Sequence, residues 1–163
     1  MTSFLSRMPI GIAGDISRPA AATVESVQID AATPPTKFGS FVKLVAGKLQ
    51  PIASGDAASV IYGLLVRPYP MSNQDGSAQG LGPGTVPASG IADVLRRGYM
   101  TVVNKQGTPA KGAAVYLRIT ADTGKAVGDI EAAGLDSGKC VAVAAQFQGA
   151  ADANGNVEIS YNI

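Results

Sequence analysis

The residue types that usually carry enzyme chemistry are scarce in this chain. Its 163 residues include no histidine and a single cysteine, Cys140. Without imidazole, the most common general base, the usual zinc ligand and the histidine-dependent serine and cysteine triads are unavailable. One cysteine also excludes an intramolecular disulfide and a multi-cysteine metal cage. We therefore expect a protein that is not an enzyme and that uses no cofactor or metal.

Three short motifs resemble chemical sites, and each has a simpler interpretation. The glycine-rich segment 80–84 lacks the helix, lysine and hydroxyl of a nucleotide-binding loop, so we interpret it as a plain loop. Asp129 and Glu131 are paired acids of the kind used in hydrolysis, but nothing fixes their separation, and we interpret them as a solvated turn. Asp152 and Asn154 begin like a calcium loop that lacks its terminal acid, which favours a hairpin turn.

The densest basic pair has two interpretations, and the cysteine has one. On a strand, Arg96 and Arg97 would point to opposite faces, so they cannot form one patch. One of them is a candidate for a bidentate contact with a carboxylate on a neighbouring subunit, and an ordinary exposed arginine is the alternative. Cys140 shares a strand face with Ala142 and Ala144, and we interpret it as a small buried or half-buried thiol.

Sparse charge suggests protein partners. Charged residues make up 15% of the chain, the net charge is +1 and the mean hydropathy is +0.18. So low a content of charged residues indicates that permanent partners cover part of the protein surface. Basic and acidic residues are interspersed along the chain, so the sequence shows no basic patch that would bind nucleic acid or anionic lipid. The longest apolar run, 60–66, is far shorter than the roughly 18 residues of a membrane span, and no signal peptide is evident. We expect no nucleic acid, membrane or small-molecule substrate as partner.

The positions of proline and glycine divide the chain into an arm and one domain. Residues 1–22 contain Pro9, Gly11, Gly14 and Pro19, which argue against a helix or long strand and predict an extended N-terminal arm. Residues 23–163 fit a single β domain, because one core usually spans about 100 to 200 residues. The Gly- and Ser-rich stretch at about 71–89 predicts a long loop between strands.

Within that domain, apolar residues alternate with the period of a β-strand. Segment 60–66 is nearly all apolar and predicts a central strand, and Gly98 stands where the strand at 91–103 could bend. Alternation recurs from Ala113 to Ile119, and Asn154-Gly155 predicts a tight turn. No strong helix pattern is present. The sequence therefore predicts an all-β fold, an antiparallel β-sandwich or small barrel, of the β-tulip or jelly-roll kind.

Four segments, in this order, resemble one protein family. They are the proline- and glycine-flanked stretch 9–19, the strand and proline pair of 58–70, the basic strand 90–99 and the C-terminal hairpin 149–163. Together they are similar to the structural cement, or capsid decoration, proteins of tailed bacteriophages. The resemblance implies a β domain on the outer surface of the virion capsid, made in the host cytoplasm. It also implies a homo-dimer or homo-trimer that binds the major capsid protein, bridges its neighbouring subunits and stabilises the shell against internal DNA pressure.

We place the candidate capsid or subunit interface on the arm and on the regions around Arg67 and Arg96. The candidate residues are Pro9, Ile10, Ile12, Asp15, Arg18, Arg67, Tyr69, Arg96, Arg97 and Tyr99. The alternative function is a virion-surface β-sandwich that recognises a host-surface glycan through the loop at 71–89. The absence of tryptophan weighs against sugar stacking in that alternative.

Overall fold

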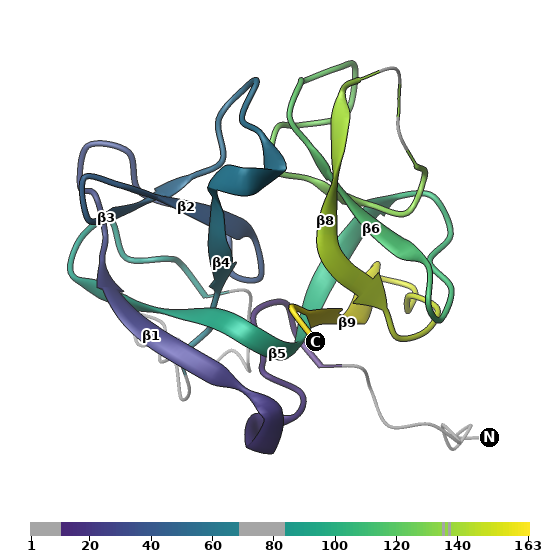
Figure 1. Cartoon of the computed structure of the whole chain (residues 1–163), viewed down its shortest axis with the longest axis horizontal. Coiled ribbons are helices and arrows are strands. Elements are labelled where there is room, and N and C mark those ends of the chain that lie inside the picture. The colour runs from purple at the N-terminus through teal and green to yellow at the C-terminus, as the bar shows by residue number, and fades with distance from the viewer. Residues whose placement is uncertain (1–10, 69–83, 135, 137) are drawn as a thin grey trace.

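Figure 1 shows a β-protein with two lobes. The computed structural model describes residues 11–68, 84–134, 136 and 138–163. The described residues form two short 3-10 turns, η1 (Pro19–Ala21) and η2 (Ala58–Val60), and no α-helix. Their nine strands are β1 (Thr23–Gln28), β2 (Phe41–Val45), β3 (Lys48–Pro51), β4 (Ile61–Leu65), β5 (Ile91–Gln106), β6 (Ala114–Arg118), β7 (Ile130–Glu131), β8 (Cys140–Phe147) and β9 (Asn156–Tyr161). The prediction of an all-β fold with a small barrel is confirmed.

The long strand β5 belongs to both lobes (Figure 1). The first half of β5 lies between β1 and β4, and the sheet continues from β4 to β2 and then to β3. A bridge between Ile29, which follows β1, and Leu49 of β3 connects the two ends of this sheet. The second half of β5 pairs with β9 and β7, and β8 and β6 complete a closed ring. Among these described pairs, β5 with β7 and the bridge between Ile29 and Leu49 are parallel, and the other strand pairs are antiparallel, as we expected of the fold.

Gly98 marks the point where β5 passes from one lobe to the other. β1 pairs with β5 as far as Arg97, and β9 pairs with it from Gly98 onward. Gly98 has φ +139°, and a Cβ at this position would lie 3.0 Å from the Cα of Ala22. A residue with a side chain would therefore be strained here, both by the backbone angle and by the close approach of the chain before β1. The expected bend at Gly98 coincides with this change of partner.

Two apolar clusters hold the lobes together. One lies inside the first lobe and includes Leu65 and Val94, and the other fills the second lobe and reaches between the lobes. β4 contributes to both, because Leu64 belongs to the second cluster and Leu65 to the first. Ile61–Leu65 of the apolar run 60–66 form β4, which lies between β2 and β5, so the predicted central strand is present and is shorter than the run. Full burial of each such side chain is worth about 1.5–3 kcal/mol.

Residues 11–22, the later part of the predicted arm, lie along the chain's own β5. Backbone bonds join the Gly14 amide to the Thr101 carbonyl (2.8 Å) and the Thr101 amide to the Asp15 carbonyl (2.9 Å), and the Ser17 amide donates to the carbonyl of Tyr99 (3.2 Å). These bonds satisfy backbone groups on the stretch of β5 that also carries β9. Residues 1–10 and most of the predicted loop 71–89 lie outside the described residues.

Candidate functional site

The predicted interface residues fall into several separate places. Pro9, Ile10 and Tyr69 lie outside the described residues. Ile12 and Asp15 are half-buried, and the Asp15 carboxylate accepts a hydrogen bond from the Ile12 amide (3.1 Å), which fixes the turn that brings the chain onto β5.

Arg18 and Tyr99 meet on the outside of the second lobe. The Arg18 guanidinium lies 3.9 Å from the ring centre of Tyr99 and donates two hydrogen bonds to the Glu158 carboxylate, of 3.0 and 2.8 Å. The Ser17 hydroxyl donates to the same carboxylate at 2.6 Å. Burial raises the pKa of Glu158, but the hydrogen bonds from Arg18 and Ser17 outweigh it and leave that pKa below its usual value. This cluster ties the segment before β1 to β9.

A second cluster of the same composition lies on the first lobe. The Arg96 guanidinium is 3.7 Å from the ring centre of Tyr62, and its Nε is 3.4 Å from a carboxylate oxygen of Glu25. The Tyr62 hydroxyl also donates to Glu25. Stacking of a guanidinium on an aromatic ring adds about 0.5–1 kcal/mol at exposed positions. Arg97, one residue further, is exposed and has no ion-pair partner in the described ranges.

The carboxylates that meet Arg18 and Arg96 belong to this chain itself. Arg96 or Arg97 was a candidate for a contact with a carboxylate on a neighbouring subunit, with an exposed arginine as the alternative, and in this structure Arg96 faces Glu25. Glu25, Tyr62 and Glu158 were not among the candidates, because no motif connects them with their partners: Glu25 and Tyr62 are 37 residues apart, and Glu158 is 140 residues from Arg18. The pairing of β1, β4 and β9 with β5 brings these residues to their partners.

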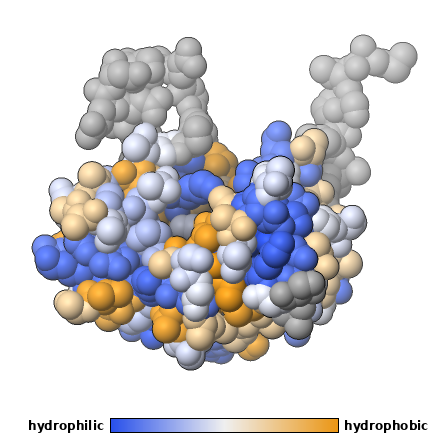
Figure 2. Space-filling view, turned by 90° about the horizontal axis from the view of Figure 1, so that it is seen from above, coloured by the Kyte–Doolittle hydropathy of each residue, from blue (hydrophilic) through white to orange (hydrophobic). Residues whose placement is uncertain are grey.

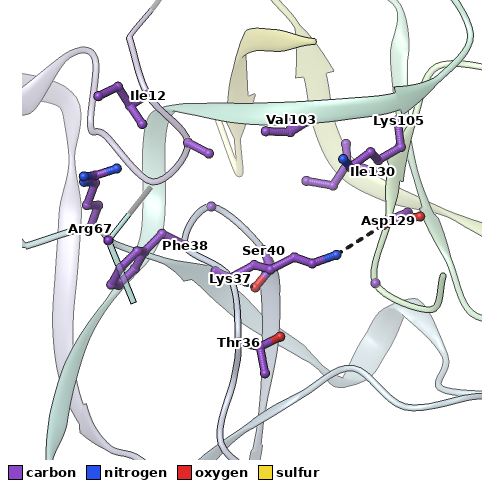
Figure 3. A pocket seen from close by; sticks show the side chains of 14 residues that line it. Ile12, Thr36, Lys37, Phe38, Ser40, Arg67, Val103, Lys105, Asp129 and Ile130 are labelled. Carbon is purple, nitrogen blue, oxygen red and sulfur yellow. Dashed lines mark hydrogen bonds and ion pairs between the residues drawn. The ribbon is translucent and has the colours of Figure 1, made fainter. Parts of the chain in front are cut away.

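A pocket opens between the two lobes, beside the turn that begins at Ile12 (Figure 3). Its volume is about 300 Å³. Ile12, Phe38, Val103 and Ile130 supply apolar walls, and the predicted interface residue Arg67 also lines it. Charged side chains complete the lining: Lys37, Lys105 and Asp129.

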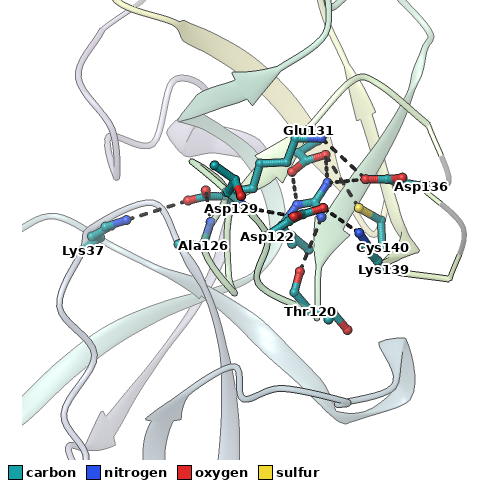
Figure 4. Close-up of polar contacts among 12 residues, drawn as sticks. Lys37, Thr120, Asp122, Ala126, Asp129, Glu131, Asp136, Lys139 and Cys140 are labelled. Carbon is teal, nitrogen blue, oxygen red and sulfur yellow. Dashed lines mark hydrogen bonds and ion pairs between the residues drawn. The ribbon is translucent and has the colours of Figure 1, made fainter.

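A buried charge cluster lies in the second lobe, where β6, β7 and the start of β8 meet (Figure 4). Arg118 and Glu131 both have fully buried side chains, and the guanidinium donates two hydrogen bonds to this carboxylate, one of them at 2.9 Å. The same guanidinium reaches Asp136 at 3.2 Å. The hydrogen bond from Arg118 holds the pKa of Asp136 below its usual value, and the bond to Glu131 raises the pKa of Arg118.

This cluster corrects our interpretation of the paired acids as a solvated turn. Asp129 and Glu131 are both buried, and Ile130–Glu131 forms the short strand β7. Asp129 accepts a hydrogen bond from the Ala126 amide (2.8 Å). The Cys140 thiol is buried as expected, 3.6 Å from the Glu131 carboxylate; burial, followed by the charge of Glu131, raises its pKa. A thiol with a raised pKa is a poor nucleophile, and an acid that is paired with a buried arginine is not poised for proton transfer.

The segment Asp152 to Asn156 forms the predicted hairpin turn between β8 and β9. One carboxylate oxygen of Asp152 accepts hydrogen bonds from the amides of Asn154 and Asn156, both at 2.8 Å. Gly155 has φ +82°, as a tight turn requires. The carboxylate thus serves the turn of its own backbone. Across the described residues, no group of three or more His, Cys, Asp or Glu side chains is arranged to hold a metal ion.

Exposed apolar side chains are spread over both lobes. The larger ones are Val24, Leu44, Val45, Val60, Ile91 and Ile163. Figure 2 shows apolar surface near the middle of one face, with polar surface on either side. A groove of about 430 Å³ between η2 and strands β8 and β9 is lined largely by small residues, including Ala58, Ala142 and Ala144. In the part of the chain described, no helix is long and apolar enough to cross a bilayer.

Comparisons with known proteins agree with this architecture. A search of curated proteins finds no match. A chain of a solved structure titled "The capsid of Myoviridae Phage XM1" superposes with a TM-score of 0.66, covering 98% of this chain and 95% of that chain at 23% sequence identity. At this identity the likeness shows a shared fold. The family model described as XM1 gp53 minor capsid protein matches residues 1–161. The chain therefore belongs to the XM1 gp53 minor capsid protein family, and it is a structural protein of a phage virion.

Proposed function

We propose that this protein is a cement protein without catalytic activity. It binds the major capsid protein on the outer surface of the capsid as a homo-dimer or homo-trimer and bridges neighbouring subunits. The observation that carries the proposal is the family match over residues 1–161, which places the chain among minor capsid proteins. A minor protein that accompanies the main shell protein suits a reinforcing role better than that of a second shell lattice.

Three features of the fold support this role. The two lobes share β5 and a common apolar cluster, so the molecule can bear load without hinging at a flexible linker. An edge-to-face contact between Phe41 of β2 and Tyr161 of β9, with ring centres 5.7 Å apart, adds to the joint between the lobes. Exposed apolar residues such as Ile91, 74% exposed, remain available for permanent contacts.

The stabilisation would follow from mass action. A protein that binds the mature shell and not its dissociated subunits lowers the free energy of the assembled state, by about 2.7 kcal/mol per site when its free concentration is 100 times its Kd. Repeated over many sites, this term opposes the outward pressure of packaged DNA.

The test is addition of purified protein to capsids that lack it. We expect co-sedimentation with the shells, density on their outer surface in a cryo-electron map and a higher temperature of DNA release. Ovalbumin at the same concentration controls for trapping in the pellet. The proposal is wrong if the protein stays in the supernatant or if its density lies inside the shell. Glycan recognition, the second candidate, depends on the loop 71–89, most of which lies outside the described residues, and no described feature favours it.

A further inference from the structure

The pocket between the lobes combines an apolar lining with an excess of positive charge. Among its 14 lining residues, three are cationic and one is anionic, whereas the whole chain carries a net charge of only +1. Figure 3 shows Lys37 extending toward Asp129 from one side and Lys105 placed beside Val103 and Ile130 on the other. Two ammonium groups therefore flank an apolar hollow.

Within the described part of the chain, Lys37 makes one long ion pair, with Asp129, and Lys105 makes none. Lys37 Nζ is 3.8 Å from Asp129 Oδ1, beyond hydrogen-bond distance, and the side chain of Lys37 is 64% exposed. The carboxylate of Asp129 already accepts the Ala126 amide, so it is held by its own loop. Lys105 is exposed and has no ion-pair partner in the described ranges. Neither ammonium group donates a hydrogen bond to a carboxylate of the described residues, so an additional carboxylate could accept one from each.

The walls of the pocket determine what kind of carboxylate fits. Phe38 is 8% exposed and Ile130 is 4% exposed, and together with Ile12 and Val103 they give the pocket an apolar lining. An inorganic anion would gain little from such walls, whereas a peptide segment that carries an acidic side chain next to an apolar one would use both features. A volume of about 300 Å³ is at the small end for a ligand site, which suits a few side chains.

We propose that this pocket receives an acidic segment of another virion protein chain, with an Asp or Glu carboxylate between Lys37 and Lys105 and a neighbouring apolar side chain against Phe38 and Ile130. Charge complementarity and the apolar lining carry the assignment. It deepens the proposed function and rests on it, because the partner that presents this segment is the shell to which the protein binds.

The test compares three variants in binding to capsids that lack the protein. In the double variant Lys37→Glu/Lys105→Glu we expect binding to weaken by roughly 10- to 100-fold, because each reversed charge would repel the incoming carboxylate. Lys37→Arg/Lys105→Arg keeps both charges and should bind nearly as well as the wild type. Lys111→Glu reverses the charge of one exposed lysine outside the pocket and should have no effect. Thermal melting of each variant shows that folding is unchanged.

Two outcomes are distinguishable. If wild-type protein binds the shells and the Lys37→Glu/Lys105→Glu variant binds equally well, the pocket assignment is wrong and the cement function stands. If wild-type protein fails to bind, the cement function is wrong, and the pocket assignment falls with it. A carbodiimide, which joins lysines directly to paired carboxylates, should cross-link Lys37 or Lys105 to a carboxylate of another chain. Cross-links only to the protein's own carboxylates would overturn the proposal.

Discussion

Replacing Glu131 with glutamine would leave the Arg118 guanidinium buried in the second lobe without its main counter-charge. Both side chains are fully buried, and the guanidinium donates two hydrogen bonds to Glu131 and one to Asp136. Glutamine keeps one acceptor oxygen but replaces the other with an NH2 donor and carries no charge, so Asp136 would be the remaining counter-charge. Removing one partner of a buried ion pair costs about 3–5 kcal/mol. Because Asp136 still offsets part of the charge, we expect a loss near 3 kcal/mol, the lower end of that range.

For a domain of this size, each kcal/mol lowers the melting temperature by about 2–4 °C, so Glu131→Gln should lower it by roughly 6–12 °C. The protein should remain folded, because single domains are stable by about 5–15 kcal/mol. Differential scanning calorimetry of the purified protein measures the shift. Asp122→Asn is the matched control: Asp122 pairs with Lys139 at 2.5 Å, but its side chain is 40% exposed, and the expected shift is under about 2 °C.

A double variant separates the effect of charge from that of packing. Arg118→Met/Glu131→Leu removes both charges and fills the space with apolar atoms, and such replacements are often neutral or stabilising. We expect its melting temperature to return to near the wild-type value or to exceed it. A Glu131→Gln melting temperature within about 2 °C of wild type would refute the reasoning. So would a double variant that is as unstable as the single one, because the cost would then come from packing.

Three further predictions concern the bend, the acid limit and the thiol. Gly98→Ala should cost about 1–3 kcal/mol, measured by urea unfolding, because the residue has φ +139° and its Cβ would meet the backbone of Ala22; an unchanged midpoint would contradict this. The pKa of Glu158 is lower in the folded than in the unfolded protein, so its contribution to stability is present above the unfolded value near 4.5 and is lost as the pH falls through the folded value. Melting temperatures should therefore fall below about pH 4.5, and less steeply in Glu158→Gln than in the wild type; equal slopes would refute a role for Glu158. Cys140, buried and with a raised pKa, should react with a disulfide reagent at pH 8 only after unfolding in urea, and rapid reaction of the native protein would show that the thiol is accessible.

The sequence predicted the strands well where one face of a strand is buried and the other is exposed. Val157 and Ile159 of β9 alternate with more exposed residues as expected, and the Asn154-Gly155 turn lies where the dipeptide indicated. These features are local, because the period of side chains along a strand and the φ angle of a turn depend on adjacent residues. The same local reasoning located the bend at Gly98.

The sequence could not predict which charges are buried. Alternation along β6 placed Arg118 on the face opposite Leu117, and we had no reason to expect that face to be covered. In the structure both residues are buried, because β7 pairs with β6 and brings Glu131 against Arg118. The acids at 129 and 131 looked like a solvated turn for the same reason. A loop that folds over a strand leaves no periodic signal in either segment.

Candidate interface residues show the same limit. The residue type of Arg96 suggested a contact with a carboxylate, whereas Arg18 was predicted only as an interface residue, and both meet carboxylates. Which chain or strand supplies each carboxylate depends on the topology of the sheet. Glu158 is distant in sequence from Arg18, and Glu25 is distant from Arg96, and each pair is brought together only by the strands that flank β5. Residue type therefore predicted the chemistry of these contacts and not their partners.

Because β5 runs through both lobes, the described residues join the lobes by a continuous strand and not by a flexible linker that could yield under tension. A pull that separates the lobes would be carried along the covalent backbone of β5, with β1 and β4 holding it on one side of Gly98 and β9 and β7 on the other. To come apart, the molecule would have to slide β5 past its partners, which shears several hydrogen bonds at once instead of opening them one by one. The same continuity means that neither lobe can unravel without removing a wall from the other, so mechanical failure of one becomes failure of both.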